Sequence, residues 1–356
     1  MSATIYDVAE KAGVSFQLAS AVLGRKKYAH ASAATRKRIF DAALQLNYRS
    51  NTAAVVLAGG SSKILGVIID SRAPESVFRI LAEIEGAADK LGYRILTAQA
   101  HDNPGKLLDS YHALRQNGVD GIISFAHDYS PLNCHLDDVL KDDPRIVYVL
   151  EAPEYPCSSV DVDIAAAMQD SVDHLREQGC RKIALLLNRR NESTPLSFTC
   201  VKRAEGFRKA CPEGTILHTF ARQESIPDIK SVCGKLLRDV LIPQHFDAVI
   251  AQNDFFAASL MNRMLAQGIR IPQDFSIVGW NDNPYNELLP ISMTSVAFDA
   301  EAIAASTLKI LLDKIDGNAD PVQIKHPLKL VIRESSRKNR MRQKFFCRPY
   351  NKQAQA

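Results

Sequence analysis

The stretch Thr4-Ile-Tyr-Asp-Val-Ala-Glu-Lys-Ala-Gly-Val-Ser15 predicts two short helices joined by a tight turn. Thr4, with Asp7 three residues later, is typical of a helix N-terminus, because both side chains can bind free amides of the first turn. Apolar residues then recur at helical spacing as far as Gly13, whose position suits the end of a helix. Ser15 can cap the next helix at once, so the two helices must cross steeply.

This arrangement indicates a helix-turn-helix, in which the second helix enters the DNA major groove by its N-terminal residues. Ser32 predicts the cap of a third helix that closes a small core. A generic helical hairpin with a solvated charged face would give a similar pattern. The apolar sides of the second and third helices are formed by Leu18, Ala19, Val22, Leu23, Ile39, Ala42, Ala43 and Leu46.

The charge distribution favours contact with a polyanion at both ends of the chain. Residues 1–62 hold eight Lys and Arg against three acids, and residues 337–356 hold seven against none. The 274 residues between them hold 29 against 37, so an acidic body carries basic ends. We expect the basic tail to be disordered, with added non-specific DNA affinity as the alternative.

Several protein classes are disfavoured by what the sequence lacks. No run of 18 uncharged apolar residues suggests a membrane span, and Asp7 and Glu10 stand where a signal peptide would be apolar, so we expect a cytoplasmic protein. The seven scattered cysteines predict buried thiols rather than disulfides or zinc ligands. We find no nucleophile elbow, phosphate loop or metal pair, and expect no enzyme, cofactor or metal; His174 is expected to be structural.

The body of the chain alternates short apolar runs with helical stretches. Unbroken apolar strands that alternate with helices predict parallel α/β sheets covered on both faces. The pattern restarts after residue 150, which indicates two Rossmann-like lobes with a ligand between them at the carboxyl ends of the strands. Strands are expected at 64–70, 94–98, 119–125, 146–150, 182–187, 247–252 and 276–280, and helices at 77–91, 107–116, 165–178, 203–210 and 257–267.

Eight short motifs occur in order along nearly the whole chain. They are TIYDVAEKAGVS (4–15), TRKRI (35–39), NY (47–48), LAG (57–59), RAEGF (203–207), ND (253–254), IPQDFSIVGWND (271–282) and LVIRESS (330–336). Together they resemble the LacI family of bacterial transcription regulators. The resemblance implies an all-α helix-turn-helix head and an α/β core with two Rossmann-like lobes of the periplasmic-binding-protein type.

The resemblance also implies a division into four segments. Residues 1–50 are the DNA-binding domain, 51–62 a hinge helix with its linker, 63–336 the effector-binding and dimerisation domain, and 337–356 the tail. In the family, two hinge helices pair in the minor groove, where a leucine matching Leu57 pries open a base step. We therefore expect a homodimer on a near-palindromic double-stranded operator, because one head buries too little surface to specify a site.

Three departures from the family pattern affect DNA recognition. Ser50 replaces the usual proline before the hinge asparagine, and the loop Arg25–His30 is about two residues longer than expected. Ala21 replaces the usual arginine of the recognition helix, which removes the commonest guanine reader. Gln17 remains and can make a bidentate contact to adenine. The DNA-binding candidates are Tyr6, Ser15, Phe16, Gln17, Ser20, His30, Asn51, Ala54 and Leu57.

Positions that match the family's cleft predict an effector site. Residues matching Arg203, Asn253 and Asn281 hold a small effector, often a sugar, through directional hydrogen bonds. Asn281 replaces the family's usual aspartate. Trp280 could pack on a sugar ring or belong to the core, and Arg203 could instead form a surface ion pair with Glu205. The strand-end rule adds Asp70 and Ser71.

These observations predict a sequence-specific transcription regulator, most simply a repressor, whose operator affinity responds to a small, sugar-like polar effector. A regulator controlled by a protein partner is the closest alternative. A periplasmic-type solute receptor would have no use for residues 1–62. A sugar-metabolising enzyme would need a catalytic constellation that the sequence does not offer.

Overall fold

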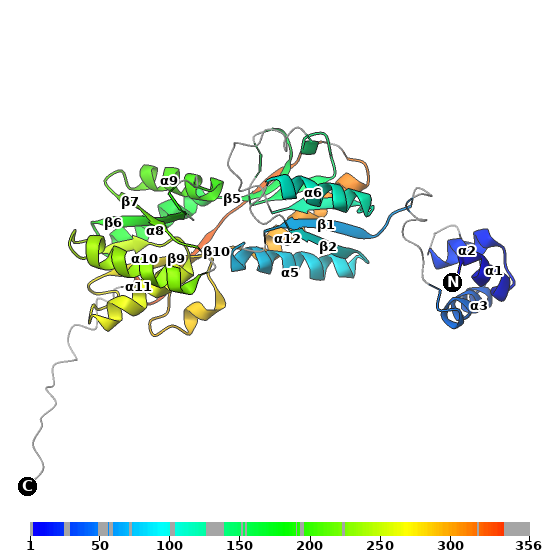
Figure 1. Ribbon diagram of the computed structural model, residues 1–356, viewed down its shortest axis with the longest axis horizontal. Coiled ribbons are helices and arrows are strands. Elements are labelled where there is room, and N and C mark those ends of the chain that lie inside the picture. Colours follow the sequence, from blue (N-terminus) through cyan, green and yellow to red (C-terminus); the bar gives the residue numbers. More distant parts are fainter. Residues whose placement is uncertain are drawn as a thin grey trace, which may run out of the picture. The chain divides into compact units, whose positions relative to one another are not determined.

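The computed structural model divides the chain into two compact units, the head (Met1–Ser62) and the core (Lys63–Ala356) (Figure 1). Each unit is described by itself. The residues described are 3–24, 29–48, 56, 60–70, 73–99, 104–125, 139–150, 152–153, 155–189, 191–192, 196–222, 225–318 and 320–337.

The described part of the head contains the three predicted helices, α1 (Ile5–Ala12), α2 (Phe16–Leu23) and α3 (Ala33–Gln45). Thr4 Oγ1 accepts a hydrogen bond from the Asp7 amide at 3.3 Å, and the Thr4 amide donates to Asp7 Oδ2 at 2.7 Å. The bond from the Thr4 amide is the main cause that lowers the pKa of Asp7. Gly13, with φ of 63°, ends α1 in the left-handed conformation that glycine adopts without strain.

A small core of mainly alanine joins the three helices. Val8, Ala19 and Ile39 are fully buried at its centre, and small side chains let the helices approach closely. Ser15 Oγ accepts from the Leu18 amide at 3.2 Å, which confirms the predicted cap of α2. The predicted cap of α3 at Ser32 is confirmed in the same way. The head is therefore a helix-turn-helix with a third supporting helix.

The first lobe of the core, the N-lobe, is a six-stranded parallel sheet in the order β11-β5-β4-β3-β1-β2. Its elements are β1 (Ile64–Ile69), α5 (Glu75–Lys90), β2 (Arg94–Gln99), α6 (Pro104–Gln116), β3 (Gly121–Ser124), β4 (Ile146–Val149), β5 (Ser158–Val162), α12 (Ala300–Ile315) and β11 (Gln323–His326).

Alternate side chains of β1 enter two different apolar layers, as the pleat of a strand requires. Leu65 and Val67 join the layer that contains Ile80 of α5, whereas Ile68 joins the layer that contains Leu114 of α6. Figure 1 draws α6 and α5 on opposite sides of this sheet. Both faces of the sheet are covered, which explains why its central strands are apolar without interruption.

The second lobe, the C-lobe, is a sheet in the order β12-β10-β9-β8-β6-β7, parallel except for β12. Its elements are α8 (Ile164–Glu177), β6 (Ile183–Arg189), α9 (Phe198–Ala210), β7 (Thr215–Phe220), α10 (Ile226–Leu236), a π-helical turn (Leu237–Leu241), β8 (Ala248–Ile250), α11 (Asp254–Ala266), β9 (Ser276–Trp280), a 3₁₀ turn (Pro284–Glu287), β10 (Thr294–Ala297) and β12 (Lys329–Val331).

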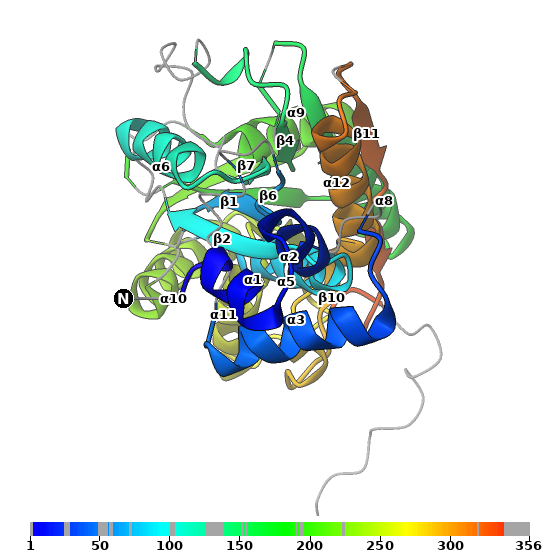
Figure 2. The same cartoon turned by 90° about the vertical axis from the view of Figure 1, so that its right-hand side faces the viewer.

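The chain passes between the two lobes three times, after β5, after β10 and after β11 (Figure 1). Figure 2 shows α12 and β11, which the chain forms on its return to the N-lobe, beside each other. Five strands of each lobe follow the same doubly wound order, which confirms the predicted fold class of two Rossmann-like lobes. The sequence pattern predicts a second lobe that follows the first along the chain. That expectation is incomplete, because the later elements α12 and β11 belong to the N-lobe. The sequence reading also missed the helices α10 and α12 and the strands β5, β7, β10, β11 and β12.

Two further expectations bear on the character of the core. Each of the five cysteines in the described residues is a buried thiol, as predicted. His174 is buried on α8 and its Nε2 lies 2.7 Å from Ser336 Oγ, so it ties this helix to the closing motif of the core. Within the described ranges, no helix is both long and apolar enough to cross a membrane.

Candidate DNA-binding and effector sites

The N-terminal end of α2 presents an aromatic and amide surface. Gln17 is exposed, while Phe16 and Ser20 are half-buried. Tyr6 of α1 is 65% exposed, and its ring stacks on that of Phe16 with a centroid distance of 4.6 Å and an interplanar angle of 13°. We call Tyr6, Phe16, Gln17 and Ser20 the reading face. Of the other DNA-binding candidates, Ser15 and His30 are exposed, and Asn51, Ala54 and Leu57 lie outside the described residues.

The cations described in the head lie outside α2. The helix Phe16–Leu23 contains no charged residue, whereas Arg36, Lys37 and Arg38 follow one another on α3. Arg36 donates to the carbonyls of Ala29 at 2.5 Å and Ala31 at 3.3 Å, so it also holds the approach to α3. Lys37 and Arg38 are exposed and suit contacts to phosphate, which position a protein without reading sequence.

Arg203 occupies the centre of the candidate effector site. It lies on α9 and is only 2% exposed. Its Nη1 donates to the carbonyl of Gln252 at 2.7 Å, its Nη2 donates to that of Ala251 at 2.8 Å, and its Nε is buried without a hydrogen-bond partner. In the described part of the core no carboxylate forms an ion pair with it, so the alternative of a surface pair with Glu205 is wrong.

The Arg203 guanidinium is buried without a carboxylate partner among the described residues, and this burial determines its pKa. Desolvation lowers the pKa of Arg203 to about 10, which leaves the guanidinium charged at neutral pH. Its Cζ lies 4.1 Å from the centroid of the Trp280 ring, within the range of a cation–π contact. A buried cation held by two main-chain carbonyls and an aromatic face is unusual for a purely structural arginine, because charged side chains are rarely buried unpaired.

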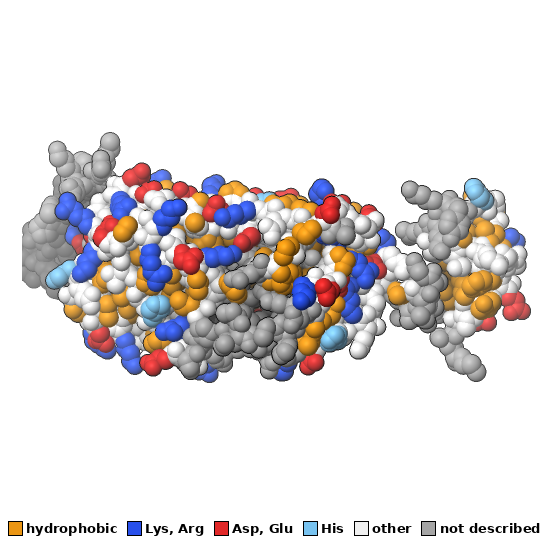
Figure 3. Space-filling model, turned by 90° about the horizontal axis from the view of Figure 1, so that it is seen from above, with side chains coloured by type: hydrophobic (Ala, Val, Ile, Leu, Met, Phe, Trp, Pro, Cys, Tyr) orange, Lys and Arg blue, Asp and Glu red, His pale blue; other side chains and the backbone are white. Residues whose placement is uncertain are grey.

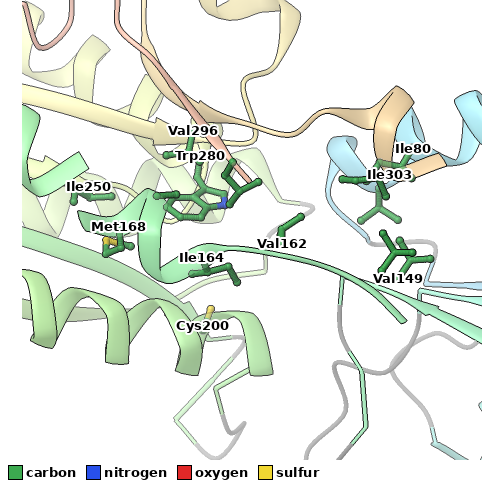
Figure 4. Packing of buried hydrophobic residues seen from close by; sticks show 14 of the residues in the cluster. Ile80, Val149, Val162, Ile164, Met168, Cys200, Ile250, Trp280, Val296 and Ile303 are labelled. Carbon is green, nitrogen blue, oxygen red and sulfur yellow. The ribbon is translucent and has the colours of Figure 1, made fainter. Parts of the chain in front are cut away.

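Trp280 supports this arrangement from within the main apolar core. It is 2% exposed, and Figure 4 shows its ring close to Val296 and Ile164. Trp280 therefore belongs to the apolar core, which was one of its two expected roles. Its ring also packs against the guanidinium of Arg203. The aromatic face is covered by the guanidinium and is not open surface.

The structure brings Asn253 and Asn281 to the same end of the C-lobe sheet. Asn253 follows β8 and caps α11, with its Oδ1 accepting from the Phe256 amide at 3.2 Å. Asn281 follows β9 with φ of 100°, and its side chain is nearly buried. Arg203 binds the carbonyl of Gln252, next to Asn253, and stacks on Trp280, next to Asn281. Four of the predicted effector residues therefore form one cluster.

The remaining effector candidates belong to the other lobe. Asp70 is half-buried and directly follows β1, as the strand-end rule requires, and its carbonyl accepts from the Ala73 amide at 3.0 Å. Ser71 lies outside the described residues. The structure thus places Asp70 at the carboxyl edge of the N-lobe sheet.

A buried amide layer beneath Arg203 was missed by sequence reasoning. The Asn188 side chain, near the end of β6, accepts from Thr219 Oγ1 at 3.0 Å, and the main-chain amide of Asn188 donates to Gln252 Oε1 at 3.0 Å. Gln252 is the same residue whose carbonyl holds Arg203. These polar side chains end apolar strands, so the strand-end rule that selected Asp70 could have found them.

Asp254 is the second feature that the sequence reading did not single out. It is fully buried; Oδ1 accepts from Ser295 Oγ at 2.6 Å, and Oδ2 accepts from the Asn283 amide at 2.7 Å. These bonds hold the loop that begins with Asn281. Arg333 fixes the other side of that loop through an ion pair with Asp282 at 2.6 Å. The motif Asn253-Asp254 pointed to this region of the sequence as part of the effector site. Its aspartate, however, stabilises the loop through buried hydrogen bonds.

Two polar bridges connect the lobes on either side of the cluster. Arg79 of α5 donates to the carbonyls of Asn281 and Asp282, the latter at 3.1 Å. Lys202 of α9 forms an ion pair of 2.8 Å with Asp161 of β5. Both bridges end beside candidate effector residues, so a ligand that displaces Asn281 or Arg203 would also change contacts between the lobes.

A separate open groove of about 730 Å³ lies elsewhere on the C-lobe. It shares no lining residue with the Arg203 cluster. Several of its lining residues, Ile271, Pro272 and Gln273, precede β9, and so lie toward the amino end of that strand. Ligands of doubly wound sheets bind at the carboxyl ends, a position that the Arg203 cluster meets and these three lining residues do not.

The ionisation of Asp254 gives a test of this loop support. Burial raises the pKa of Asp254 to about 6, above its ordinary value of 3.8, so ionisation opposes folding. Its contribution to stability is therefore greatest below about pH 4 and falls as the pH rises to about 6. Asp254→Asn does not titrate, so the stability of the wild type relative to this variant should fall by up to about 3 kcal/mol across that interval.

Thermal unfolding of both proteins from pH 4 to pH 8 checks this expectation. Other titrating groups are common to both and cancel in the difference. The variant amide can keep the contact to Ser295, because a serine hydroxyl can accept as well as donate. A difference in stability that stays constant with pH would mean that Asp254 carries no ionisation penalty.

Comparison with known proteins extends over nearly the whole chain. Residues 4–51 match the family model of bacterial regulatory proteins, lacI family, and residues 172–336 match that of the periplasmic binding protein-like domain. The lactose operon repressor of Escherichia coli (strain K12) is 27% identical over 347 residues, covering 94% of this chain and 90% of that protein. The ribose operon repressor of Halalkalibacterium halodurans is 28% identical over 342 residues, covering 94% and 97%.

A solved structure has the same fold as this chain. The crystal structure of the lac repressor dimer bound to operator and the anti-inducer ONPF matches with a TM-score of 0.80 and 25% identity, over 94% of this chain and 99% of that one. A helix-turn-helix head followed by a two-lobed core of this type defines a DNA-binding regulator of transcription. This chain combines a helix-turn-helix domain that matches the lacI family with a periplasmic-binding-protein-like core, and its relatives are LacI-type operon repressors. These relatives are transcriptional repressors rather than enzymes, and the solute-receptor alternative is not favoured.

Proposed function

We propose that this regulator is a repressor whose operator affinity is controlled by a small polar effector bound between its lobes. The observation that carries the proposal is Arg203, a buried cation with no carboxylate partner in the described core and with an unused Nε donor. Such a group is costly to bury, which favours a functional reason for its presence. The site comprises Arg203, Asn253, Trp280 and Asn281, with Asp70 and Ser71 from the N-lobe.

The chemistry of the cluster suits a ligand rich in hydroxyl groups. Arg203 uses two of its five N–H donors on main-chain carbonyls and retains the others. Asn281 offers one acceptor and one donor where the family usually has a carboxylate, and Asp70 supplies carboxylate acceptors from the other lobe. Names of relatives, including the lactose, sucrose and ribose operon repressors, support a sugar or related metabolite as the effector class.

The transmission of the signal would follow from the bridges between the lobes. A ligand shifts a conformational equilibrium only by its differential affinity for the two arrangements, typically ~1–3 kcal/mol of coupling. Arg79 binds the carbonyl of Asn281 itself, so an effector at that residue would act on a contact that joins the lobes. A changed lobe arrangement would then alter the geometry of the hinge segment 51–62, for which Leu57 remains the proposed minor-groove wedge.

The proposed assembly is a homodimer on a near-palindromic operator in the cytoplasm, with segments 1–50, 51–62, 63–336 and 337–356 as predicted. The lac repressor that this chain resembles was crystallised as a dimer on its operator. Exposed apolar side chains on the core, such as Phe78, Phe255 and Leu288, supply surface that a second subunit can cover. Over the core face drawn in Figure 3, charges of both signs are interspersed. The proposed DNA-binding part is the head, which contains the helix-turn-helix.

The proposal is tested by an operator-binding assay with a panel of ligands. A genome-wide binding footprint supplies the operator, and fluorescence anisotropy then measures its affinity with sugars, sugar phosphates and nucleobases added in turn. One class of polar ligand should change operator affinity by about 5- to 150-fold, the usual range of such coupling. Failure of every small ligand would favour control by a protein partner.

A further inference from the structure

We propose that the reading face selects A·T base pairs in each half-site, with Gln17 on adenine and the Phe16 ring against a thymine methyl group. The inference rests on the DNA-binding function of the head and goes beyond it by naming the class of sequence bound. Amide side chains pair with adenine N6 and N7, apolar groups contact the thymine methyl, and Arg or Lys is the usual partner of guanine.

The first observation is the absence of a cation from α2. The exposed and half-buried residues of this helix carry one amide, one hydroxyl and apolar groups, and no positive charge. Ala21, where a guanine reader would stand in the family, is 8% exposed and so offers almost no surface of its own. Arg25, Lys26 and Lys27 lie outside the described residues and follow the C-terminal end of α2, whereas bases are read by the N-terminal residues.

The second observation is the fixed aromatic pair. The near-parallel stack of Tyr6 on Phe16 restricts the Phe16 ring on one side, so the ring presents its remaining surface in a defined orientation. Phenylalanine has no hydrogen-bond donor or acceptor in its side chain. Its contribution to base recognition must therefore be an apolar contact, and the only apolar group in the major groove is the thymine methyl.

The third observation is that Gln17 is held by a capped first turn. Ser15 Oγ accepts from the Leu18 amide at 3.2 Å, which fixes the backbone on both sides of Gln17. The Gln17 side chain is exposed and available for a bidentate contact. Exposed Lys37 and Arg38 of α3 can supply phosphate contacts, so affinity for the backbone does not require a cation on the reading face.

The test begins with in vitro selection of the full-length protein on random duplex DNA. Enriched sites should carry A·T pairs at one or more symmetric pairs of half-site positions. Gln17→Arg, at an exposed position that leaves the head core untouched, should move the preference at one symmetric pair from adenine to guanine. Gln17→Ala should reduce the discrimination there by about 5- to 100-fold.

The methyl contact is tested separately on the selected operator. Replacing a half-site thymine by deoxyuridine removes only the methyl group, and the wild-type dissociation constant should rise about three- to tenfold. Phe16→Ala should bind both operators alike, whereas Phe16→Tyr should keep the sensitivity to the methyl group. Circular dichroism of each variant establishes that the head is folded.

The outcomes separate this inference from the function on which it rests. Selection of G·C pairs at the positions read by Gln17, or equal wild-type affinity for thymine and deoxyuridine operators, would overturn the inference alone. A protein that enriches no sequence at all would overturn both the inference and the operator-binding function.

Discussion

Gly279→Ala should lower the free energy of unfolding of the core by about 3 kcal/mol or more, at the upper end of overpacking effects. Gly279 lies in the central strand β9, where an added Cβ would overlap Oδ1 of Asp254. That oxygen cannot easily move, because Asp254 is fully buried and bound to Ser295 and Asn283. The Cβ would also lie only 3.3 Å from Ser295 Oγ.

Gly86→Ala is the matched control for this substitution. Gly86 lies in the middle of α5, and an added Cβ there meets no atom within 4 Å. Alanine is the better helix former, so this variant should gain up to about 1 kcal/mol. Urea unfolding of both variants by far-UV circular dichroism measures the contrast. Similar stability of the two variants would show that the Asp254 loop yields to accommodate a methyl group.

The alternation of apolar runs and helices was sufficient to predict the fold class. Strands such as β1 and β4 are buried on both faces, so their sequences are continuously apolar and easy to recognise. Strand β5, Ser158–Val162, is also buried, yet it contains two serines and an aspartate and gives no such signal. Its stability comes from pairing with β4 and β11, which only the tertiary structure supplies.

The return of the chain to the N-lobe could not be read from local pattern. Helix α12 was not predicted, and nothing local assigns it to a sheet whose first five strands end at Val162, before the C-lobe strands β6 to β10. Its burial against α5 and β3 is a property of the whole core. Local periodicity therefore predicts elements, while their assignment to lobes depends on long-range contacts.

The candidate sites show the same division between local and long-range information. Caps at Thr4 and Ser15 depend on neighbours three residues away, and the structure confirms both. Arg203 and Asn281 were identified by their family motifs, but the carbonyls that hold Arg203 and the bridge from Arg79 were not predictable. Any residue type offers a main-chain carbonyl as a hydrogen-bond acceptor, so the sequence does not show which carbonyls bind Arg203.

Arg203→Met should abolish the response to the effector while changing the free energy of unfolding by less than about 2 kcal/mol. Removal of an unpaired buried cation stabilises the fold. The substitution also leaves the carbonyls of Ala251 and Gln252 without a hydrogen-bond donor, which costs about 1–3 kcal/mol for each carbonyl. A methionine of similar length keeps a contact with Trp280. Ligand-free operator binding should remain near that of the wild type, because Arg203 belongs to the core unit and the reading face to the head.

Arg208→Met provides the control, since Arg208 lies on the same helix and is exposed. It should bind effector and operator as the wild type does. Isothermal titration with the identified effector and operator anisotropy with and without it separate the two functions. An Arg203→Met protein that still responds would remove Arg203 from the effector site. A variant that loses ligand-free operator binding would instead assign the buried guanidinium a structural role, because its effect would then reach the head without any ligand.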